Sequence, residues 1–256
     1  MATRPVTTMA TPDAPDGSAR YNRRMGKHPP KSHPIAKRPP VQPQHGDTVP
    51  SGPVSPAAHA PMYWECPVCG FLSGNLTLAD IASICPSCGA TGVKRRTFPN
   101  DRLRRLDERI RRYFAEGEPE IVVILGAAFL EAILEDILDR IMAAHGADVA
   151  IRRTLMDAQR AIGGRIGHVF PELTGVEFED IAEELGFRDF PKRWRTLRSQ
   201  RNDFIHDSPF NGDVPEIGNV TAAEAMLLMD QSYKLFVLVN NRFVADGIKS
   251  RDAGGT

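Results

Sequence analysis

The cysteines of this chain occur in two copies of one short pattern, and this pattern constrains the fold more than any other feature. The sequence reads Cys66-Pro-Val-Cys69-Gly and then Cys85-Pro-Ser-Cys88-Gly, with fifteen residues between Cys69 and Cys85. Two thiolates separated by two residues on a tight turn can reach one ion, and two such turns complete a tetrahedral shell of four sulfurs. The glycine after each second cysteine permits a positive φ, which lets backbone N–H groups point at sulfur. The spacing therefore predicts a metal site with the ligands Cys66, Cys69, Cys85 and Cys88.

The paired C-P-x-C-G turns resemble the knuckles of rubredoxin-like zinc ribbons, which indicates a small zinc ribbon over residues 61–97. We expect the Zn²⁺ to be structural, because four cysteine ligands close the shell and leave no position for water or substrate. Iron is the alternative metal, since a shell of four sulfurs also suits iron. Two disulfides are the alternative to a metal, and an intracellular location disfavours them. The sequence shows neither an apolar signal segment at its N-terminus nor an apolar stretch of membrane length, so we expect a cytoplasmic protein that does not bind membranes.

Charge is segregated along the chain, although its 32 basic and 32 acidic residues sum to zero. Residues 1–60 hold twelve of the 21 prolines and eight basic residues against three acidic ones. Such a segment buries too little surface to offset its ordering entropy. We therefore expect a disordered, Pro-rich basic tail, which serves either as a plain linker or as a weak attractor of nucleic acid. Residues 94–113 are also basic, whereas residues 114–256 carry 15 basic and 24 acidic residues. A ribbon beside the basic run 94–96 suits protein contacts or, with a slight preference, nucleic acid.

Beyond the ribbon the apolar pattern has a helical period, and no strand-like alternation is present. The first helix is expected from Asn100 or Asp101 to Gly117, with an arginine-rich outer face that is most often solvated in such helices. The second begins at Pro119, ends near Gly146, and is the most hydrophobic, which places it at the centre of a bundle. Shorter helices are expected at 148–162, 176–185 and 191–207, the first of them ending at a Gly163-Gly164 turn.

The last helix is expected to begin with the capping box Thr221-Ala-Ala-Glu224 and to end near Gly247. We therefore predict an all-α helical bundle over residues 98–247. Residues 248–256 are predicted to form a flexible C-terminus.

Residues 198–206, which read RSQRNDFIH, carry the most chemical information. Asn202 and His206 are four residues apart and share a helix face, which Arg198 extends. Arg201 lies about 140° from His206 around the helix, but its long side chain can reach round it. One helix can therefore present a cation and a titratable imidazole to one cleft. The structural alternatives are a His206 that caps its helix end, and an Arg201 that pairs with Asp203 or with an acidic neighbouring helix.

This pattern resembles the R-x4-6-H motif of the HEPN superfamily (higher eukaryotes and prokaryotes nucleotide-binding), in which Asn often follows the Arg. In that family the motif lies in a late helix of an all-α bundle, and the order here is similar: long buried helices, then the motif, then one closing helix. Residues 125–136, LGAAFLEAILED, are similar to the family's early helix, which often carries an acidic residue. The resemblance covers about residues 100–247, and some HEPN proteins carry a cysteine zinc ribbon before the bundle.

The resemblance implies a metal-independent endoribonuclease, often a toxin or phage-defence effector, that works as a homodimer with two motif helices in one cleft. His206 would move a proton at the ribose 2′-OH or the leaving 5′-oxygen, for which the unperturbed histidine pKa of about 6.5 is suitable. Arg201 would hold the phosphate and Asn202 would orient it. The products would be a 2′,3′-cyclic phosphate and a 5′-hydroxyl. An antitoxin or another protein is an implied partner beside RNA.

Residues 188–201 form a basic island in an otherwise acidic domain, with six basic residues against Asp189 alone. We expect Trp194 in this island to stack on a base. The expected RNA-binding residues are Arg198, Arg195, Lys192 and Trp194. The alternative to an enzyme is a non-catalytic module, in which the ribbon and the bundle bind nucleic acid or a partner protein. A transcription-associated factor that works through the ribbon alone is a third hypothesis.

Overall fold

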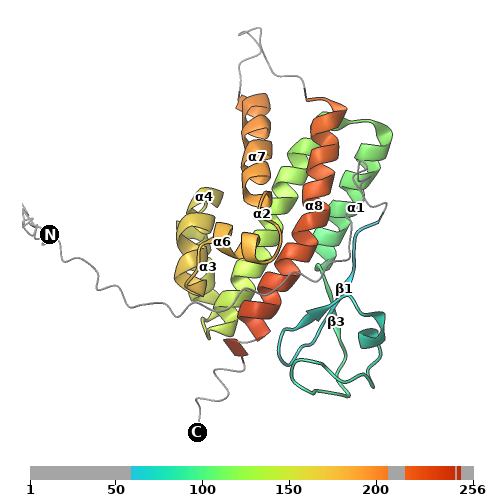
Figure 1. Cartoon of the computed structure of the whole chain (residues 1–256), viewed down its shortest axis with the longest axis vertical. Coiled ribbons are helices and arrows are strands. Elements are labelled where there is room, and N and C mark those ends of the chain that lie inside the picture. Colours follow the sequence, from blue (N-terminus) through green and yellow to red (C-terminus); the bar gives the residue numbers. More distant parts are fainter. Residues whose placement is uncertain (1–58, 207–216, 246, 249–256) are drawn as a thin grey trace, which may run out of the picture. The chain divides into compact units, whose positions relative to one another are not determined.

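The computed structural model describes residues 59–206, 217–245 and 247–248. Most of these residues are helical, and a small antiparallel sheet precedes the helices (Figure 1). The described elements belong to one compact unit, Ser51–Thr256. The predicted basic tail over residues 1–60 lies outside the described residues except for its last two positions, and so does the predicted C-terminal segment beyond residue 248.

The sheet consists of three short strands that hold the cysteine turns. Strand β1 spans Tyr63–Glu65, β2 spans Leu72–Ser73 and β3 spans Arg96–Phe98. β1 lies in the middle and pairs with both neighbours in antiparallel register. The first cysteine turn connects β1 to β2, and the second lies between β2 and β3, after a 3-10 turn η1 at Leu76–Ala79.

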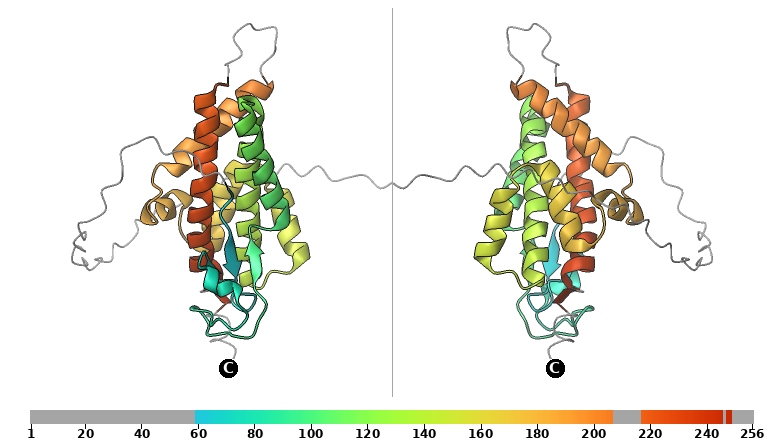
Figure 2. Two further views of the ribbon diagram at one scale, coloured as in Figure 1. Left: turned by 90° about the vertical axis from the view of Figure 1, so that its right-hand side faces the viewer. Right: turned by 90° about the vertical axis from the view of Figure 1, so that its left-hand side faces the viewer.

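Helix α2 (Pro119–Ala144) is the centre of the helical part, as its sequence predicts. It packs along α1 (Asp101–Glu116) and α8 (Asn219–Asn240), and it also contacts α3 (Val149–Ala158) and α7 (Phe190–His206) (Figures 1 and 2). The predicted caps of α1 are confirmed: Asn100 accepts hydrogen bonds from two backbone N–H groups of the first turn, and Gly117 ends the helix with a φ of 77°. Among the described helices, none has both the length and the apolar character of a membrane span.

The predicted turn at Gly163-Gly164 is wrong. Both glycines lie in a helical run that consists of α4 (Ile162–Gly164), the π-helical turn η2 (Arg165–Val169) and α5 (Phe170–Thr174). Helix α3 ends earlier, at Ala158, where Arg165 donates hydrogen bonds to the carbonyl groups of Gln159 and Met156. A side chain from the next segment therefore closes α3, and a sequence pattern does not show such a contact.

The predicted capping box of the last helix is also wrong. α8 begins at Asn219 with Gly218 as its N-cap, so Thr221 lies inside the helix. Glu224 does not bend back to the helix start but accepts a hydrogen bond from Arg193 Nη2 of α7 at 2.8 Å. An ion pair between two helices has replaced the local cap.

The arginine face of α1 is solvated only in part. Arg111 is 8% exposed and pairs with Asp107 in its own helix and with Asp230 of α8, the latter at 2.7 Å. Tyr233 of α8 donates its hydroxyl to Asp107 at 2.6 Å. Burial, followed by the charge of Asp107, raises the pKa of Tyr233, which keeps the hydroxyl protonated as a donor. This buried network joins α1 to α8, so Arg111 does not belong to a nucleic-acid surface.

The ribbon is held on the bundle by the end of α8 and by the π-helical turn η3 (Asn241–Ala245) that follows it. The side-chain amide of Asn241 acts like a neighbouring strand for β2: it accepts from the Leu72 N–H at 2.7 Å and donates to the Leu72 carbonyl at 2.8 Å. Leu72 and Phe98 belong to the same hydrophobic core as the helices. A Cβ on Gly70, whose φ is 71°, would lie 2.6 Å from Val244 Cγ1. The predicted pieces 61–97 and 98–247 therefore share one core.

Replacing Asn241 should measure the strength of this connection. Asn241→Ala is expected to lower the free energy of unfolding by about 2 kcal/mol, because both backbone polar groups of the buried Leu72 lose their partner. Asn219→Ala removes an exposed asparagine at the start of α8 and should change it by less than about 0.5 kcal/mol. Denaturant unfolding of both variants tests this expectation. Equal stability of the two would contradict the role of Asn241.

Candidate functional site

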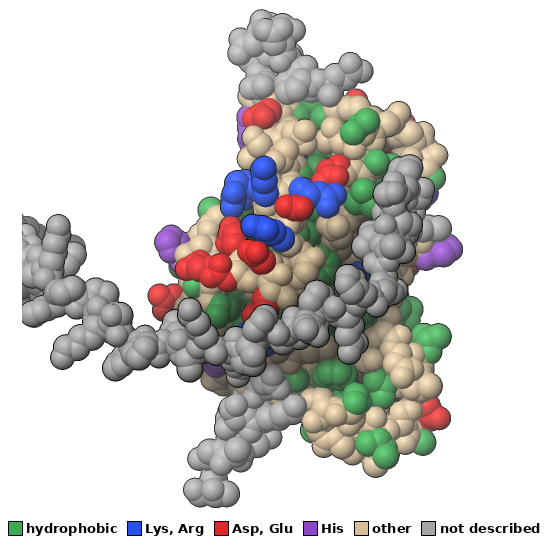
Figure 3. Space-filling view, in the orientation of Figure 1, with side chains coloured by type: hydrophobic (Ala, Val, Ile, Leu, Met, Phe, Trp, Pro, Cys, Tyr) green, Lys and Arg blue, Asp and Glu red, His purple; other side chains and the backbone are tan. Residues whose placement is uncertain are grey.

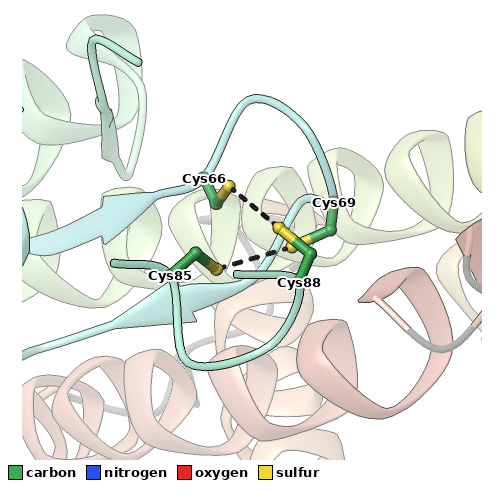
Figure 4. A group of neighbouring side chains, drawn as sticks. All are labelled: Cys66, Cys69, Cys85 and Cys88. Carbon is green, nitrogen blue, oxygen red and sulfur yellow. Dashed lines mark hydrogen bonds between the residues drawn. The ribbon is translucent and has the colours of Figure 1, made fainter. Parts of the chain in front are cut away.

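The two cysteine turns bring four sulfur atoms to one point, as the spacing predicts (Figure 4). All four Sγ atoms lie within 4.8 Å of one another, and the pairs Cys66–Cys88 and Cys69–Cys85 are each 3.8 Å apart. Metal–sulfur bonds of about 2.3 Å in a tetrahedron give sulfur–sulfur edges of about 3.8 Å. The four cysteines are not disulfide-bonded. The geometry therefore fits one metal ion with four sulfur ligands, and the disulfide alternative is wrong.

The two turns have the same backbone geometry. The Gly70 N–H donates to the Cys66 carbonyl at 2.8 Å, and the Gly89 N–H donates to the Cys85 carbonyl at 2.9 Å. The glycine φ angles are 71° and 73°, so the predicted positive φ is confirmed. Burial alone would raise the pKa of Cys85, but hydrogen bonds from backbone N–H groups of its turn outweigh this effect and lower the pKa to about 7. At Cys85 these hydrogen bonds favour the thiolate, which is the form that binds metals. Burial raises the pKa of Cys69 to about 12 and also raises that of Cys88.

A buried arginine joins the two turns. Arg95 is 7% exposed; its Nη1 donates to Cys66 Sγ at 3.0 Å, and its Nη2 donates to the carbonyl groups of Ser83 and Ala90 at 2.9 and 3.0 Å. Four thiolates around a divalent ion leave a net negative charge, so a neighbouring cation lowers the cost of burying the cluster. From the sequence, the ribbon beside the basic run 94–96 suited protein contacts or, with a slight preference, nucleic acid. For Arg95 a nucleic-acid contact is wrong, because the side chain is buried and faces sulfur.

Replacing Arg95 should loosen the metal. Arg95→Met is expected to weaken metal affinity by about tenfold or more, because the sulfur shell loses a charge-assisted hydrogen bond. Arg95→Lys keeps the charge and should recover part of the loss. Arg96→Met, an exposed neighbour on β3, is the matched control and should behave as the wild type. The measurement is the rate at which a coloured chelator takes the metal from each variant, and equal rates for Arg95→Met and Arg96→Met would contradict the assignment.

The outer surface of the ribbon is apolar. The side chains of Val68, Leu76, Ile81 and Ile84 are each more than half exposed. Figure 3 shows hydrophobic side chains gathered over the ribbon. Residues 61–93 contain neither Lys nor Arg. This surface offers no cation to a phosphate, and its composition suits contact with a protein.

Helix α7 carries the RSQRNDFIH motif and holds its arginines against α2. Arg201 Nη2 donates to Glu131 Oε1 at 2.8 Å, and Arg198 Nε lies 3.5 Å from the same oxygen. The structural alternative for Arg201, a pair with an acidic neighbouring helix, is therefore present. Burial lowers the pKa of Arg198; Glu131 raises it, and the nearby charges of Arg201 and Arg195 lower it further. Glu131 thus holds two guanidinium groups that repel each other.

The last turn of α7 leaves Asn202 and His206 exposed. The helix is continuous from Phe190 to His206, so these two residues lie one turn apart on one face, as predicted. In the described part of the chain, the His206 side chain has no hydrogen bond or ion pair. Its imidazole is accessible to a ligand.

The expected RNA-binding residues do not form one surface. Arg195 is exposed and pairs with Glu179 of α6 (Phe178–Glu184), with 3.0 Å between Nη2 and Oε1. Lys192 is exposed on another side of α7, where it lines a groove against α8 together with Thr196 and Thr221. Figure 3 shows basic side chains over α7 with acidic ones directly beside them. The basic island is therefore neutralised in part by neighbouring helices.

The prediction that Trp194 stacks on a base is wrong, because the side chain is only 1% exposed. It packs edge-on or tilted against Phe178, Phe190 and Phe236. The sequence contained a signal for this: Phe190, Trp194 and Leu197 follow each other at helical spacing and mark the buried face of α7. The arginines around Trp194 in the sequence had suggested an exposed side chain instead.

The structure thus places the predicted site residues in three different locations. The cysteines meet at one point, the arginines of the motif meet at Glu131, and Lys192 lies apart from both. Comparison of the chain with protein-family models, curated proteins and solved structures finds no match.

Proposed function

We propose that this chain is a metal-independent endoribonuclease of the HEPN type, with α7 as the catalytic helix. The observation that carries the proposal is the position of the R-N-x3-H motif. It lies at the end of a late helix that packs on the long buried helix α2, with its cations joined to Glu131 and His206 exposed. The proposed catalytic residues are Arg201, His206 and Asn202.

In the proposed reaction the ribose 2′-OH attacks the adjacent phosphorus, and the bond from phosphorus to the 5′-oxygen breaks. One His206 accepts the proton of the 2′-OH, and the His206 of a second copy donates a proton to the leaving oxygen. The products are a 2′,3′-cyclic phosphate and a 5′-hydroxyl, so the step needs neither water nor a metal. A homodimer with two α7 helices in one cleft provides both imidazoles, one to accept a proton and one to donate a proton.

Arg201 has the donors that this reaction needs. A guanidinium carries five N–H donors, and the contact with Glu131 uses one of them. Its Nε is buried, and the remaining Nη donors can bind the phosphate and stabilise the negative charge that develops on it. Glu131 is a positioning residue, because it fixes the guanidinium and does not itself contact the RNA. The metal in the cysteine site supports the fold and takes no part in the chemistry.

Replacing Arg201 tests its role separately from folding. Arg201→Ala is expected to reduce RNA cleavage by about a hundredfold or more, because one charged donor to the developing oxyanion is lost. Arg188→Ala removes a highly exposed arginine just before α7 and should cleave as the wild type. Initial rates on a labelled RNA pool and thermal unfolding of both variants are the measurements. Cleavage by Arg201→Ala at the rate of Arg188→Ala would rule out this role.

Two observations favour a second function, a non-catalytic binding module. Arg201 is already engaged by Glu131, and the ribbon presents an apolar surface that suits a protein partner, such as an antitoxin. Under this hypothesis the chain binds RNA or a protein without cutting RNA. A dimer with intact RNA binding and uncut RNA would favour it over the enzyme.

A further inference from the structure

A small cavity of about 210 Å³ lies where α6 and α7 meet the segment from α4 to η2. Helix α7 contributes Trp194, Arg195 and Arg198 to its wall, and α6 contributes Glu179. The cavity shares Arg198 with the motif, but His206 and Arg201 do not line it. It is therefore a separate place on α7.

The indole N–H of Trp194 on this wall is buried and has no hydrogen-bond partner among the described residues. Arg198 Nε is also buried, and its nearest acceptor is Glu131 Oε1 at 3.5 Å, an ion-pair distance that is too long for a good hydrogen bond. Trp194 and Arg198 are four residues apart, so they lie on the same side of α7. A buried donor without a partner costs about 1–3 kcal/mol. Tryptophan N–H groups that are buried usually find a partner, so an acceptor in the cavity would be stabilised.

The charged residues that line the cavity leave one positive charge in excess, since Arg195 and Arg198 stand against Glu179 alone. Arg195 pairs with Glu179, and Arg198 reaches Glu131 outside the cavity. Arg198 and Arg201 share a single carboxylate oxygen. The lowered pKa of Arg198 has burial as its first cause, and the neighbouring cations add to it. An anion at this point would relieve that repulsion.

The opposite wall is open because it consists partly of glycine. A Cβ on Gly163 or on Gly167 would meet no atom within 4 Å, and both residues line the cavity. Gly167 lies in the π-helical turn η2, a rare conformation that is frequent at functional sites. Pockets for drug-sized ligands measure about 300–1,000 Å³. A cavity of about 210 Å³ therefore admits a smaller group.

We propose that this cavity binds a phosphoryl group, with the Trp194 indole N–H and the Arg198 guanidinium as inner donors and the exposed Arg195 as the outer one. The group can belong to a free mononucleotide or to a phosphate of an RNA strand. The inference does not depend on the ribonuclease mechanism, because it uses neither His206 nor Arg201 as a ligand to the phosphate.

The test uses the two tryptophans of the full chain as internal reporters. Trp64 also has a buried indole N–H without a partner, but it lies in the ribbon, so it is the control signal. In ¹⁵N-labelled protein, inorganic phosphate should shift the indole signal of Trp194 in a saturable way and leave that of Trp64 in place. The variant Trp64→Phe assigns the two signals.

Two variants on α7 remove one positive charge each. Arg195→Ala should weaken phosphate binding by about tenfold, the loss of one charge-assisted hydrogen bond. Lys192→Ala, whose side chain lines the groove on the other side of the helix, should bind as the wild type. Trp194→Phe removes the N–H and keeps an aromatic ring, and calorimetry should then show a several-fold loss.

Titrations with uridine monophosphate and with a short uncleavable RNA distinguish the sources, since the tighter ligand identifies which of them the cavity takes. An unshifted Trp194 signal, equal shifts of Trp64 and Trp194, or equal losses in Arg195→Ala and Lys192→Ala would overturn the proposal. Phosphate binding in a chain that does not cut RNA would retain this site and reject the proposed function. RNA cleavage by a chain that does not bind phosphate in this cavity would support the proposed function and reject the phosphate site.

Discussion

Cys66→Ser is expected to destabilise the whole described unit by at least about 5 kcal/mol, and not only the ribbon. Structural zinc sites supply apparent binding free energies of about 10–16 kcal/mol, most of which a missing ligand forfeits. The loss reaches the helices because Leu72 and Phe98 of the ribbon strands are buried in the core that α2 and α8 build. Since domains are stable by about 5–15 kcal/mol, the variant should be largely unfolded. Thermal unfolding followed by the helical circular dichroism signal, together with metal content, measures this.

The matched control for Cys66→Ser is Val68→Ala. Val68 lies in the first cysteine turn, is 51% exposed and is not a ligand, so the variant should keep both the metal and the wild-type unfolding temperature. Removal of the metal from the wild type by a strong chelator should reproduce the effect of Cys66→Ser. Helices that melt at the wild-type temperature in Cys66→Ser would show that the bundle folds without the ribbon, contrary to the shared core.

His206→Ala is expected to reduce RNA cleavage by about 10²–10⁴-fold, the usual contribution of a general acid or base. Stability should not change, because His206 is exposed and contacts no described side chain through a hydrogen bond. His168→Ala removes an exposed histidine in η2 and is the control for a general effect of histidine loss. The measurement is the single-turnover cleavage rate of one RNA by the wild type, by His206→Ala and by His168→Ala. Equal rates for His206→Ala and His168→Ala would remove His206 from the mechanism.

Local features of the fold followed from the sequence because they depend on neighbouring residues only. The repeated C-P-x-C-G pattern placed four sulfurs around one point, with Gly70 and Gly89 at positive φ. The cap residues Asn100 and Gly117 marked both ends of α1. The long apolar segment after Pro119 marked the central helix. In each case the rule uses residues within one continuous stretch of the chain, so contacts with distant segments do not change the result.

Contacts between distant segments did not follow from the sequence. The spacing of Arg95, Asn241 and Glu131 does not show that they meet Cys66, Leu72 and Arg201. Periodicity tells which residues share a helix face, but it does not tell which neighbour covers that face. Trp194 shows the same limit: its charged sequence neighbours suggested exposure, whereas the apolar residues at helical spacing place it in the core.

The measurement that tests the central claim most directly is the chemistry of the RNA ends. A labelled RNA pool is incubated with the full chain without added divalent ions. A chelator is added in a parallel reaction, which is stopped while metal analysis still finds the ion in the cysteine site. We expect cuts by the wild type that leave 2′,3′-cyclic phosphate and 5′-hydroxyl ends, and no cuts by His206→Ala. Ends with a 3′-hydroxyl, cleavage that requires added Mg²⁺, or RNA that is bound but uncut would contradict a metal-independent ribonuclease built on α7.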